Sequence, residues 1–308
     1  MEKFKLIEKI KSLYEEGGNI IQYLKSEDNR SFNTIEDILI SYDFQSGSYI
    51  KEYYNNKEFK DQYSSAIAHV INKLGKFDSI IEAGVGEATT LGVMLKSLDQ
   101  QPKHALGFDL SWSRIYYADN FVREQGFKSA TLFTSDLFET PLKDNSIDVV
   151  YTSHALEPNG GKEKEALTEL YRIAKKYVVL LEPCYEFASE EAKARMIKHG
   201  YVTKLLDTAK LLGYKVLEHR LFGISSNPLN PTGLLIIEKN GDSHDDDHAQ
   251  LVCPISKTAL TNFDNNVLYS RESLLAYPII KGIPCLLKQN AVLAAHFMMD
   301  YKTFRNND

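Results

Sequence analysis

The chain has 308 residues, of which 43% are hydrophobic and 25% charged, and its formal net charge is -6. These values are typical of a globular protein, with room for one large α/β domain and a smaller attachment. No apolar run approaches the about 18 to 20 residues of a membrane span, and residues 1–11 lack the apolar core of a signal peptide, so we expect a cytoplasmic protein without membrane contact. The acidic balance disfavours broad nucleic-acid binding, which needs a basic face.

Residues 1–65 are expected to be polar and helical, because apolar side chains such as Phe4 and Ile7 recur at helical spacing. Residues 29–33 are expected to form a turn. Residues 42–49 mix aromatic and small polar side chains without a period. We interpret this segment as a connecting loop, and the alternative is a lid or substrate wall, since loops often carry contacts.

Strands and helices alternate through the next part of the chain. Strands are expected at residues 79–83, 105–109, 130–134, 147–151, 177–182, 215–222 and 234–239. Helices are expected at residues 64–74, 88–97, 113–125, 162–174 and 201–212. This alternation predicts an α/β fold with a Rossmann-like, mostly parallel sheet. The last two strands are too close for a helix between them, which predicts an antiparallel C-terminal hairpin at the sheet edge.

A glycine-containing loop follows the first expected strand and reads Glu82-Ala83-Gly84-Val85-Gly86-Glu87-Ala88. Glycines at this place let the backbone turn sharply and approach a ligand closely. Acidic residues also follow the next two strands. Asp109 can take the ribose hydroxyls of an adenosine, and Asp136 can accept from its adenine amino group. Because parallel strands end at one edge of a sheet, we expect Glu82, Asp109 and Asp136 to line one cleft.

The acidic residues of the loop distinguish between two classes of cofactor. A dinucleotide site needs a third glycine, where this chain has Thr89, and a helix N-terminus free of negative charge. Glu82 and Glu87 would repel a diphosphate. S-adenosylmethionine has no phosphate and carries a sulfonium and an ammonium group, which suit an anionic surround. We therefore predict S-adenosylmethionine as the cofactor.

From about Phe77 to Lys239 the sequence resembles the class I S-adenosylmethionine-dependent methyltransferases. The matching motifs are the Glu/Asp-x-Gly-x-Gly loop at 82–86, the acidic strand end in Gly107-Phe108-Asp109-Leu110-Ser111, the acidic position at Asp136, and the fourth-strand segment 148–157. One departure is Ala88, where many members have a third glycine. The resemblance implies methyl transfer from S-adenosylmethionine.

By this resemblance, Glu82, Gly84 and Gly86 surround the methionine part of the cofactor, Asp109 holds the ribose, and Asp136 and Leu137 bracket the adenine. The complete expected set of cofactor contacts is Glu82, Ala83, Gly84, Gly86, Asp109, Leu110, Asp136, Leu137 and Ser153. Trp112 either flanks the adenine or packs inside the protein.

A hydroxyl that accepts a methyl group must lose its proton, and a His or carboxylate can take it. The candidates follow the fourth and fifth strands: His154, Glu157 and Glu182. His154 is otherwise a histidine bonded to backbone at a helix start, and Glu182 a solvent-exposed strand end. Residues 224–233 form a stiff turn that either overhangs the pocket with Asn227 or Asn230, or only connects the hairpin.

The end of the chain resembles a second family, the small zinc-ribbon-like proteins that activate methyltransferases. The matching parts are Leu251-Val252-Cys253-Pro254-Ile255-Ser256 and residues 277–287. Ser256 replaces the second cysteine of the Cys-x-x-Cys found in zinc-bearing members, and a structural zinc normally needs four ligands, so we predict a metal-free module. A short helix is expected at 294–297. The acidic stretch 240–250 is interpreted as a linker, with a metal site as the alternative.

These inferences divide the chain into a helical region at 1–65, a methyltransferase domain at 66–240, an acidic linker at 241–250 and a small α+β accessory module at 251–308. The predicted reaction is methylation of a hydroxyl or amine on a small polar metabolite or sugar, with no metal ligand in the site. The alternatives are an RNA or protein methyltransferase and a non-catalytic cofactor-binding assembly protein. The module is expected to brace or cover the domain, or to bind a second copy or another protein.

Overall fold

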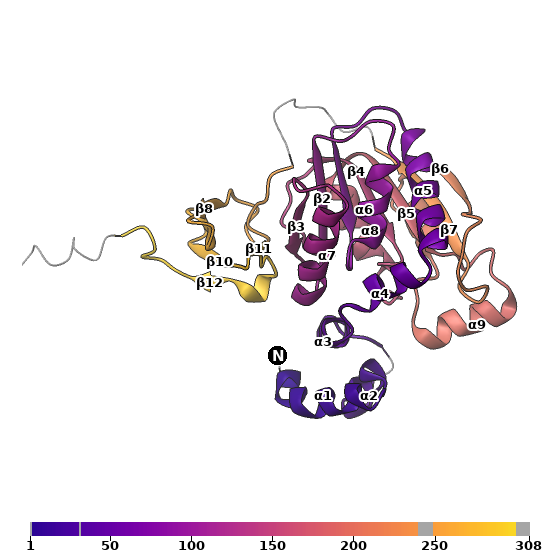
Figure 1. The fold of residues 1–308 in the computed structure, drawn as a ribbon, viewed down its shortest axis with the longest axis horizontal. Helices are drawn as coiled ribbons and strands as arrows, with labels where there is room; N and C mark the ends of the chain where they lie inside the picture. The colour runs from indigo at the N-terminus through magenta and orange to yellow at the C-terminus, as the bar shows by residue number, and fades with distance from the viewer. Residues whose placement is uncertain (1, 31, 240–248, 300–308) are drawn as a thin grey trace, which may run out of the picture.

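The centre of the protein is a seven-stranded sheet with the strand order β3-β2-β1-β4-β5-β7-β6 (Figure 1). The computed structural model describes residues 2–30, 32–239 and 249–299, so most of the expected acidic linker lies outside the described residues. The strands are β1 Ser79–Ala83, β2 His104–Asp109, β3 Thr131–Thr134, β4 Ile147–Ser153, β5 Ala174–Pro183, β6 Lys215–Leu221 and β7 Thr232–Glu238.

The pairing directions confirm the predicted fold class. Strands β1 to β5 pair in parallel, whereas β7 runs antiparallel between β5 and β6. Parallel neighbours need crossover helices, and the short connection from β6 to β7 allows only an antiparallel pair. The sheet is therefore Rossmann-like with an antiparallel hairpin at one edge.

Helices cover both faces of the sheet. One face packs against α5 Lys57–Asn72, α6 Thr89–Lys96 and α7 Trp112–Glu124, and the other against α8 Glu163–Ile173 and α10 Leu205–Leu211. Side chains alternate between the two layers, so Ile80 joins the first core and its neighbour Ile81 the second. All five residues of β1 are buried, which fixes the strand that carries the glycine loop. No helix of the described residues is long and apolar enough to cross a membrane.

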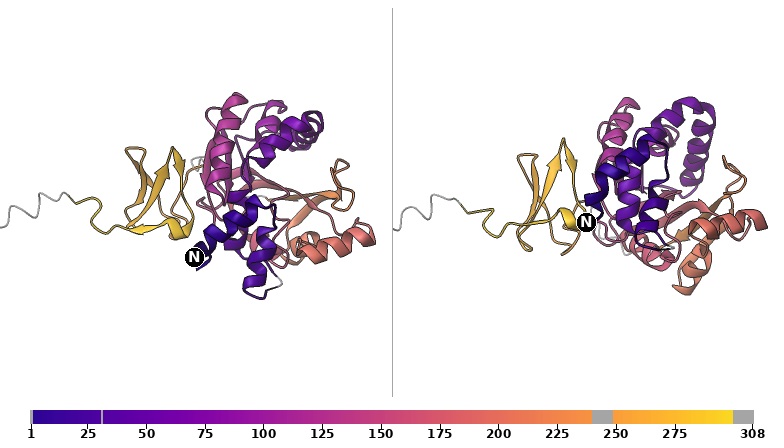
Figure 2. Two further views of the ribbon diagram at one scale, coloured as in Figure 1. Left: turned by 60° about the horizontal axis from the view of Figure 1, so that its bottom comes forward. Right: turned by 90° about the horizontal axis from the view of Figure 1, so that it is seen from below.

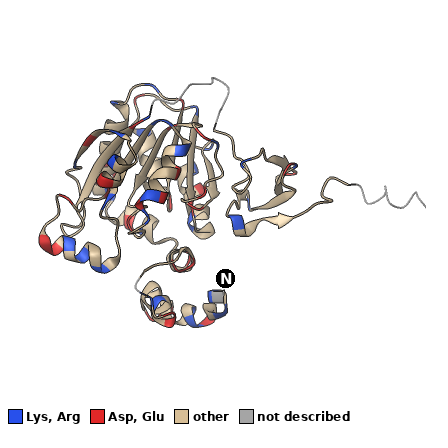
Figure 3. Cartoon of the chain, turned by 180° about the vertical axis from the view of Figure 1, so that it is seen from behind, with Lys and Arg blue, Asp and Glu red and all other residues tan. Residues whose placement is uncertain are grey.

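Two expectations about the helices were wrong or incomplete. Residues 42–49, expected to be a loop, mostly belong to α3 Ile35–Phe44 and α4 Ser48–Asn55, with a short turn at Gly47. The additional helix α9 Glu190–His199 starts at the Ser189 cap, with acidic residues in its first turn and basic residues in its last (Figure 3). These charges complement the helix dipole.

The N-terminal helices η1 Glu2–Leu6, α1 Ile7–Glu15, α2 Ile20–Glu27 and α3 lie below the sheet in Figure 1, and α3 contacts α7 (Figure 2). Asp43 at the end of α3 accepts hydrogen bonds from the backbone N–H of Ser113 (3.1 Å) and the hydroxyl of Ser111 (2.7 Å). Both serines stand at the start of α7, just after β2. These hydrogen bonds hold the N-terminal helical region next to the start of α7, on the side of the glycine loop.

A second, antiparallel sheet follows the Rossmann-like sheet. It contains β8 Thr261–Phe263, β9 Val267–Ser270, β10 Leu275–Ile280, β11 Ile283–Pro284 and β12 Val292–Leu293, with η2 Lys288–Asn290 before the last strand. The short helix expected at 294–297 is wrong: the backbone forms a turn there, with the N–H of Phe297 donating to the carbonyl of Ala294. One hydrogen bond closes a turn, but a helix needs several in succession.

This second sheet packs on the β3 edge of the large sheet (Figures 1 and 2). The N–H of Leu286 donates to the carbonyl of Thr134 at 3.1 Å, and Lys257 Nζ donates to the carbonyl of Thr140 at 2.7 Å. Tyr277 and Leu286 belong to the same hydrophobic core as α8. An open strand edge is a template for aggregation, and this contact covers it.

We expect Leu286→Ala to destabilise the whole protein. Its side chain is fully buried in the shared core, so the truncation should cost about 2–5 kcal/mol of unfolding free energy. Trp112 fluorescence during urea denaturation measures the effect, because this tryptophan lies on α7 and not in the second sheet. Leu293→Ala, at a side chain 74% exposed, is the matched control. An unchanged Trp112 midpoint in the Leu286 variant would show that the two sheets unfold independently.

Candidate functional site

A cavity of about 330 Å³ opens where β1, β2 and β4 end. Strand β1 lies between β2 and β4, so this is the point at which the strand order reverses, where ligands of such sheets bind. Its volume is at the lower end of the range for small-ligand pockets, about 300–1,000 Å³. The N-terminal helices and residues 225–232 close it from the other side.

The glycine loop forms one wall of the cavity and uses its glycines for close approach. Gly84 and Gly86 have φ values of 72° and 55°, in the left-handed region. A Cβ on Gly84 would lie 2.3 Å from the Cβ of Ala155, and one on Gly86 would lie 3.3 Å from the ring of Tyr49. Larger residues therefore do not fit. Ala88 adopts a φ of 56° at the position where a third glycine is common.

Three carboxylates meet at this cavity, as expected: Glu82 from β1, Asp109 from β2 and Asp136 from the segment after β3. Burial raises the pKa of Glu82 to about 8, although the Tyr151 hydroxyl donates to its Oε2 at 2.8 Å. Burial also raises the pKa of Asp109, against the opposing charge of Arg114 and the N–H groups of Gly86 and Ser111. Buried carboxylates gain most from a cationic ligand that supplies the missing opposite charge.

The expected cofactor residues that line the cavity are Glu82, Gly84, Gly86, Asp109, Leu110, Asp136, Leu137 and Ser153. Ala83 is buried in the core behind the loop and does not line the cavity. Trp112 stacks on Tyr116, with ring centroids 5.4 Å apart, instead of facing the cavity. Burial raises the pKa of Asp136, whose Oδ1 accepts from the N–H of Phe138.

The expectation that Glu87 faces the ligand was wrong. Its side chain is fully buried, and its two oxygens accept from the backbone N–H groups of Gly47 and Ile50, each at 2.8 Å. Glu87 therefore caps the start of α4. The contact ties the end of the glycine loop to the N-terminal helices, so the electrostatic selection against a diphosphate depends on Glu82, Asp109 and Asp136.

Comparison with known protein families finds one match in this chain. The family described as "Methyltransferase domain" matches residues 81–181. Residues 81–181 are therefore similar to a methyltransferase domain. This match supports an enzyme that transfers methyl groups. No curated protein matches the sequence.

A solved methyltransferase structure has a similar fold. The magnesium protoporphyrin IX methyltransferase of Synechocystis PCC 6803, solved with bound S-adenosylhomocysteine, is 13% identical, with a TM-score of 0.50, over 65% of this chain and 98% of that chain. A SAM-dependent methyltransferase from Aquifex aeolicus is 18% identical, with a TM-score of 0.43, over 55% of this chain and 87% of that chain. At this level of identity the likeness concerns the fold.

His154 lines the cavity and is held in one orientation by two partners. Its Nδ1 lies 2.8 Å from Oε2 of Glu157, and its Nε2 lies 2.9 Å from the hydroxyl of Thr232. A carboxylate only accepts hydrogen bonds, so Nδ1 carries the hydrogen and Nε2 of the neutral ring is an acceptor. The side chain is 31% exposed. The Nε2 atom of His154 is therefore suited to take a proton.

Burial tends to lower the pKa of His154, but the hydrogen bond and negative charge of Glu157, with the charge of Glu182, outweigh it and raise the pKa above its usual value. Burial tends to raise the pKa of Glu157, yet its bonds to His154, Tyr201 and Asn230 lower it overall. Glu157 therefore stays ionised behind the histidine. It does not line the cavity.

Glu182, the third residue predicted to be catalytic, lies away from the cavity. It is 2% exposed, not a solvent-exposed strand end, and burial raises its pKa to about 7. Its oxygens accept from the N–H groups of Ala155 (3.0 Å) and Glu157 (3.1 Å). These bonds hold the turn after β4, in which His154 has a φ of 55°. Glu182 is placed to position the histidine turn.

Several lining residues were missed in the sequence because they come from distant elements. Tyr42, Tyr49, Lys60 and Tyr63 from the N-terminal helices line the cavity, as does Arg114 from α7. The only sequence signal was the aromatic segment 42–49, for which a substrate wall was the alternative interpretation. Asn227 and Asn230 also line the cavity, so the turn at 224–233 overhangs it.

The raised pKa of Glu82 predicts that, without cofactor, the free energy of unfolding of the protein falls as the pH rises. A carboxyl whose folded pKa is raised stabilises the fold at low pH, and this stability is lost as pH rises from about 4.5 towards 8. A pKa difference of one corresponds to about 1.4 kcal/mol, so the loss should reach a few kcal/mol. Urea denaturation at about pH 5.5 and 8.5 measures it. Glu82→Gln should make the dependence flatter; an equal slope in the variant would assign it to other groups.

Proposed function

We propose that the enzyme methylates a hydroxyl on a small polar acceptor that also carries a negatively charged group. The observation that carries this proposal is that His154, held by Glu157 and Thr232, lines the same cavity as the carboxylates of Glu82, Asp109 and Asp136. S-adenosylmethionine is the proposed cofactor and would supply the electrophilic methyl group. The remaining tasks of the protein are to align the acceptor, exclude water and take its proton.

A hydrogen-bonded chain is available for the proton. The acceptor hydroxyl would replace or join the Thr232 hydroxyl at His154 Nε2. It would pass its proton to the ring as its oxygen bonds to the methyl carbon and the bond from that carbon to the cofactor's sulfur breaks. Glu157, 2.8 Å from Nδ1, then stabilises the positively charged ring. An acceptor amine that is already unprotonated would not need this base, so the arrangement favours a hydroxyl.

Two further lining residues support a polar, anionic acceptor. Asn230 donates from Nδ2 to Glu157, while its buried Oδ1 has no hydrogen-bond partner in the protein and suits a donor group of the acceptor. Lys60 on α5 lines the cavity near His154. Among the interactions of the described residues, the side-chain ammonium group of Lys60 has no hydrogen bond or ion pair, so its charge is available to a carboxylate or phosphate of the acceptor.

The test is transfer of a labelled methyl group from S-adenosylmethionine to a cell extract separated into small metabolites, RNA and protein. The small metabolites are then divided on an anion-exchange column. We expect label in small compounds that the column retains. Label only in RNA or protein would overturn the small acceptor, and label only in unretained compounds would overturn its negative charge.

We expect Lys60→Gln to weaken use of the retained compounds. The loss of one charge-assisted hydrogen bond, about 1.5–3 kcal/mol, should raise KM roughly 10- to 100-fold with a smaller change in kcat. Lys51→Gln, at an exposed position of α4, is the matched control. An unchanged KM in the Lys60 variant would remove Lys60 from the acceptor site.

We also propose that residues 251–299 act as a brace. They cover the β3 edge through the bonds of Leu286 and Lys257 to Thr134 and Thr140, next to the strand that leads to Asp136. Cys253 is buried against Tyr277, with Sγ 3.3 Å from the hydroxyl. The resemblance to zinc-ribbon-like activators remains a prediction.

A further inference from the structure

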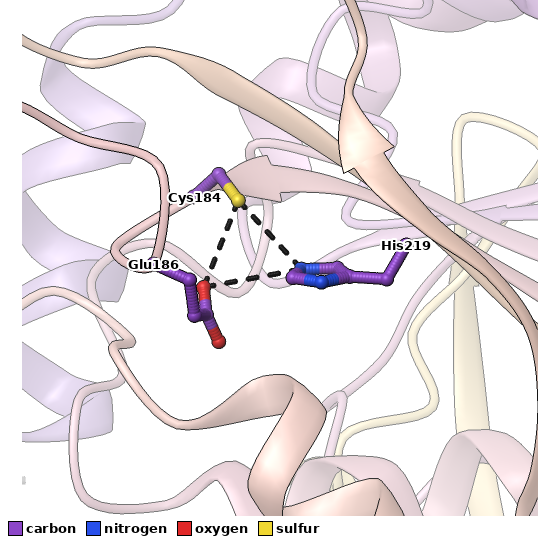
Figure 4. Close-up of side chains that lie close together, drawn as sticks. All are labelled: Cys184, Glu186 and His219. Atoms are coloured by element: carbon purple, nitrogen blue, oxygen red, sulfur yellow. Dashed lines mark hydrogen bonds and ion pairs between the residues drawn. The ribbon is translucent and has the colours of Figure 1, made fainter.

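A cluster of three metal-binding side chains lies at the edge of the sheet formed by the β5, β7 and β6 strands. Cys184 comes directly after β5, Glu186 follows two residues later, and His219 stands on the edge strand β6 (Figure 4). The three donor atoms point toward one another. No metal ligand was expected at this place from the sequence, in which 35 positions separate Cys184 from His219.

The distances in this cluster fit a metal ion. Cys184 Sγ lies 3.6 Å from Glu186 Oε2 and 3.7 Å from His219 Nε2, and the latter two atoms are 3.9 Å apart. The centre of such a triangle is about 2.2 Å from each corner, and zinc binds Cys, His and carboxylate ligands at about 2.0–2.3 Å. An ion at the centre therefore needs almost no movement of the side chains.

The direct contacts among the three groups are weak. Cys184 Sγ is at hydrogen-bonding distance from Glu186 and His219, but a thiol is a weak donor and acceptor, and Glu186 and His219 form only a loose ion pair at 3.9 Å. Among the ion pairs of the described residues, His219 is the partner of Glu186, and no Lys or Arg neutralises it. A divalent cation would supply the missing charge and bind the thiolate.

The protein also leaves space at this place. A Cβ on Gly233 would lie 2.7 Å from Cys184 Cβ and 2.8 Å from its Sγ, so glycine on β7 is needed for the thiol to fit. A small cavity of about 20 Å³ is lined by all three ligands, which is enough for one water molecule. A water molecule there can complete a four-coordinate site.

We propose that Cys184, Glu186 and His219 bind a zinc ion, with water as the fourth ligand. The ion ties the segment after β5 to the edge strand β6. Cys184 N donates to the carbonyl of Pro231 at 2.9 Å, so the same segment supports the turn that brings Asn230 and Thr232 to the acceptor. The site lies outside the cofactor cavity, and its role is to stabilise this end of the sheet.

The test measures metal in the full chain, purified without an affinity tag of histidines. The protein is dialysed against zinc and then metal-free buffer, and its zinc is counted by mass spectrometry. We expect one zinc per chain, and after replacement by Co²⁺ an absorption band from thiolate-to-metal charge transfer. Cys184→Ser should lose the band, whereas Cys285→Ser, at another buried thiol, should keep it.

Zinc far below one per chain, or a cobalt band that persists in Cys184→Ser, would overturn the proposal. If Cys184→Ser does not fold, His219→Gln and the spectrum of the unchanged protein decide the question. Thermal denaturation gives an independent readout, because zinc should raise the melting temperature of the unchanged protein and not that of His219→Gln. Cofactor binding does not enter any of these measurements, so they are independent of the proposed reaction.

Discussion

Asp109→Asn is expected to lower the affinity for S-adenosylmethionine about 100-fold, on the order of 3 kcal/mol. The carboxylate already accepts from the N–H groups of Gly86 and Ser111, each at 3.0 Å, and retains lone pairs for the ribose hydroxyls. In asparagine, an NH2 group replaces one of the carboxylate oxygens. This donor then faces the N–H donor of Gly86 or Ser111, with which it cannot form a hydrogen bond. The variant thus loses both a ligand contact and the support of the glycine loop.

Isothermal titration calorimetry with S-adenosylmethionine measures this loss, and circular dichroism shows that the variant remains folded. Asp119→Asn is the matched control, because Asp119 lies on the outer side of α7 and pairs with Arg123. The control should bind as the unchanged protein does. An affinity within about threefold of the unchanged protein for Asp109→Asn would remove Asp109 from the cofactor contacts.

The cofactor end of the cavity could be predicted from sequence because its residues follow consecutive strands. Glu82, Asp109 and Asp136 need only the rule that parallel strands end at the same edge of a sheet. Their burial could not be predicted, since it depends on the N-terminal helices. The role of Glu87 was missed for the same reason: its partners, Gly47 and Ile50, are about 40 residues away, on a helix expected to be a loop.

The acceptor end and the edge cluster depend on contacts between distant segments. His154 meets Thr232 across 78 positions, and this contact requires the antiparallel register of β5 and β7. The short connection between two strands predicts a hairpin, but the register of the hairpin depends on packing.

Helix α9 did have a local signal in Ser189, Glu190 and Gly200, but it buries only Ala192 and Met196, so its apolar period is weak.

His154→Gln is expected to lower kcat by about 100- to 10,000-fold, because glutamine cannot take the proton of the acceptor hydroxyl. Affinity for S-adenosylmethionine should change little, since the imidazole is bonded to Glu157 and Thr232 and not to any of the expected cofactor residues. Methyl transfer to the retained metabolites and calorimetry separate the two effects. His69→Gln, at an exposed position of α5, is the matched control. A kcat within about threefold of the unchanged enzyme would show that His154 is not the base.

Glu157→Gln tests the same base through its pKa. Glu157 raises the pKa of His154, so its loss should move that pKa down and shift the acid limb of kcat/KM to lower pH. An NMR titration of labelled histidine, with the His154 signal assigned by its absence in His154→Gln, measures the pKa without an acceptor. The variant should also have a lower kcat, because the charged ring loses its carboxylate partner. An unchanged acid limb together with a lowered histidine pKa would mean that a different group takes the proton.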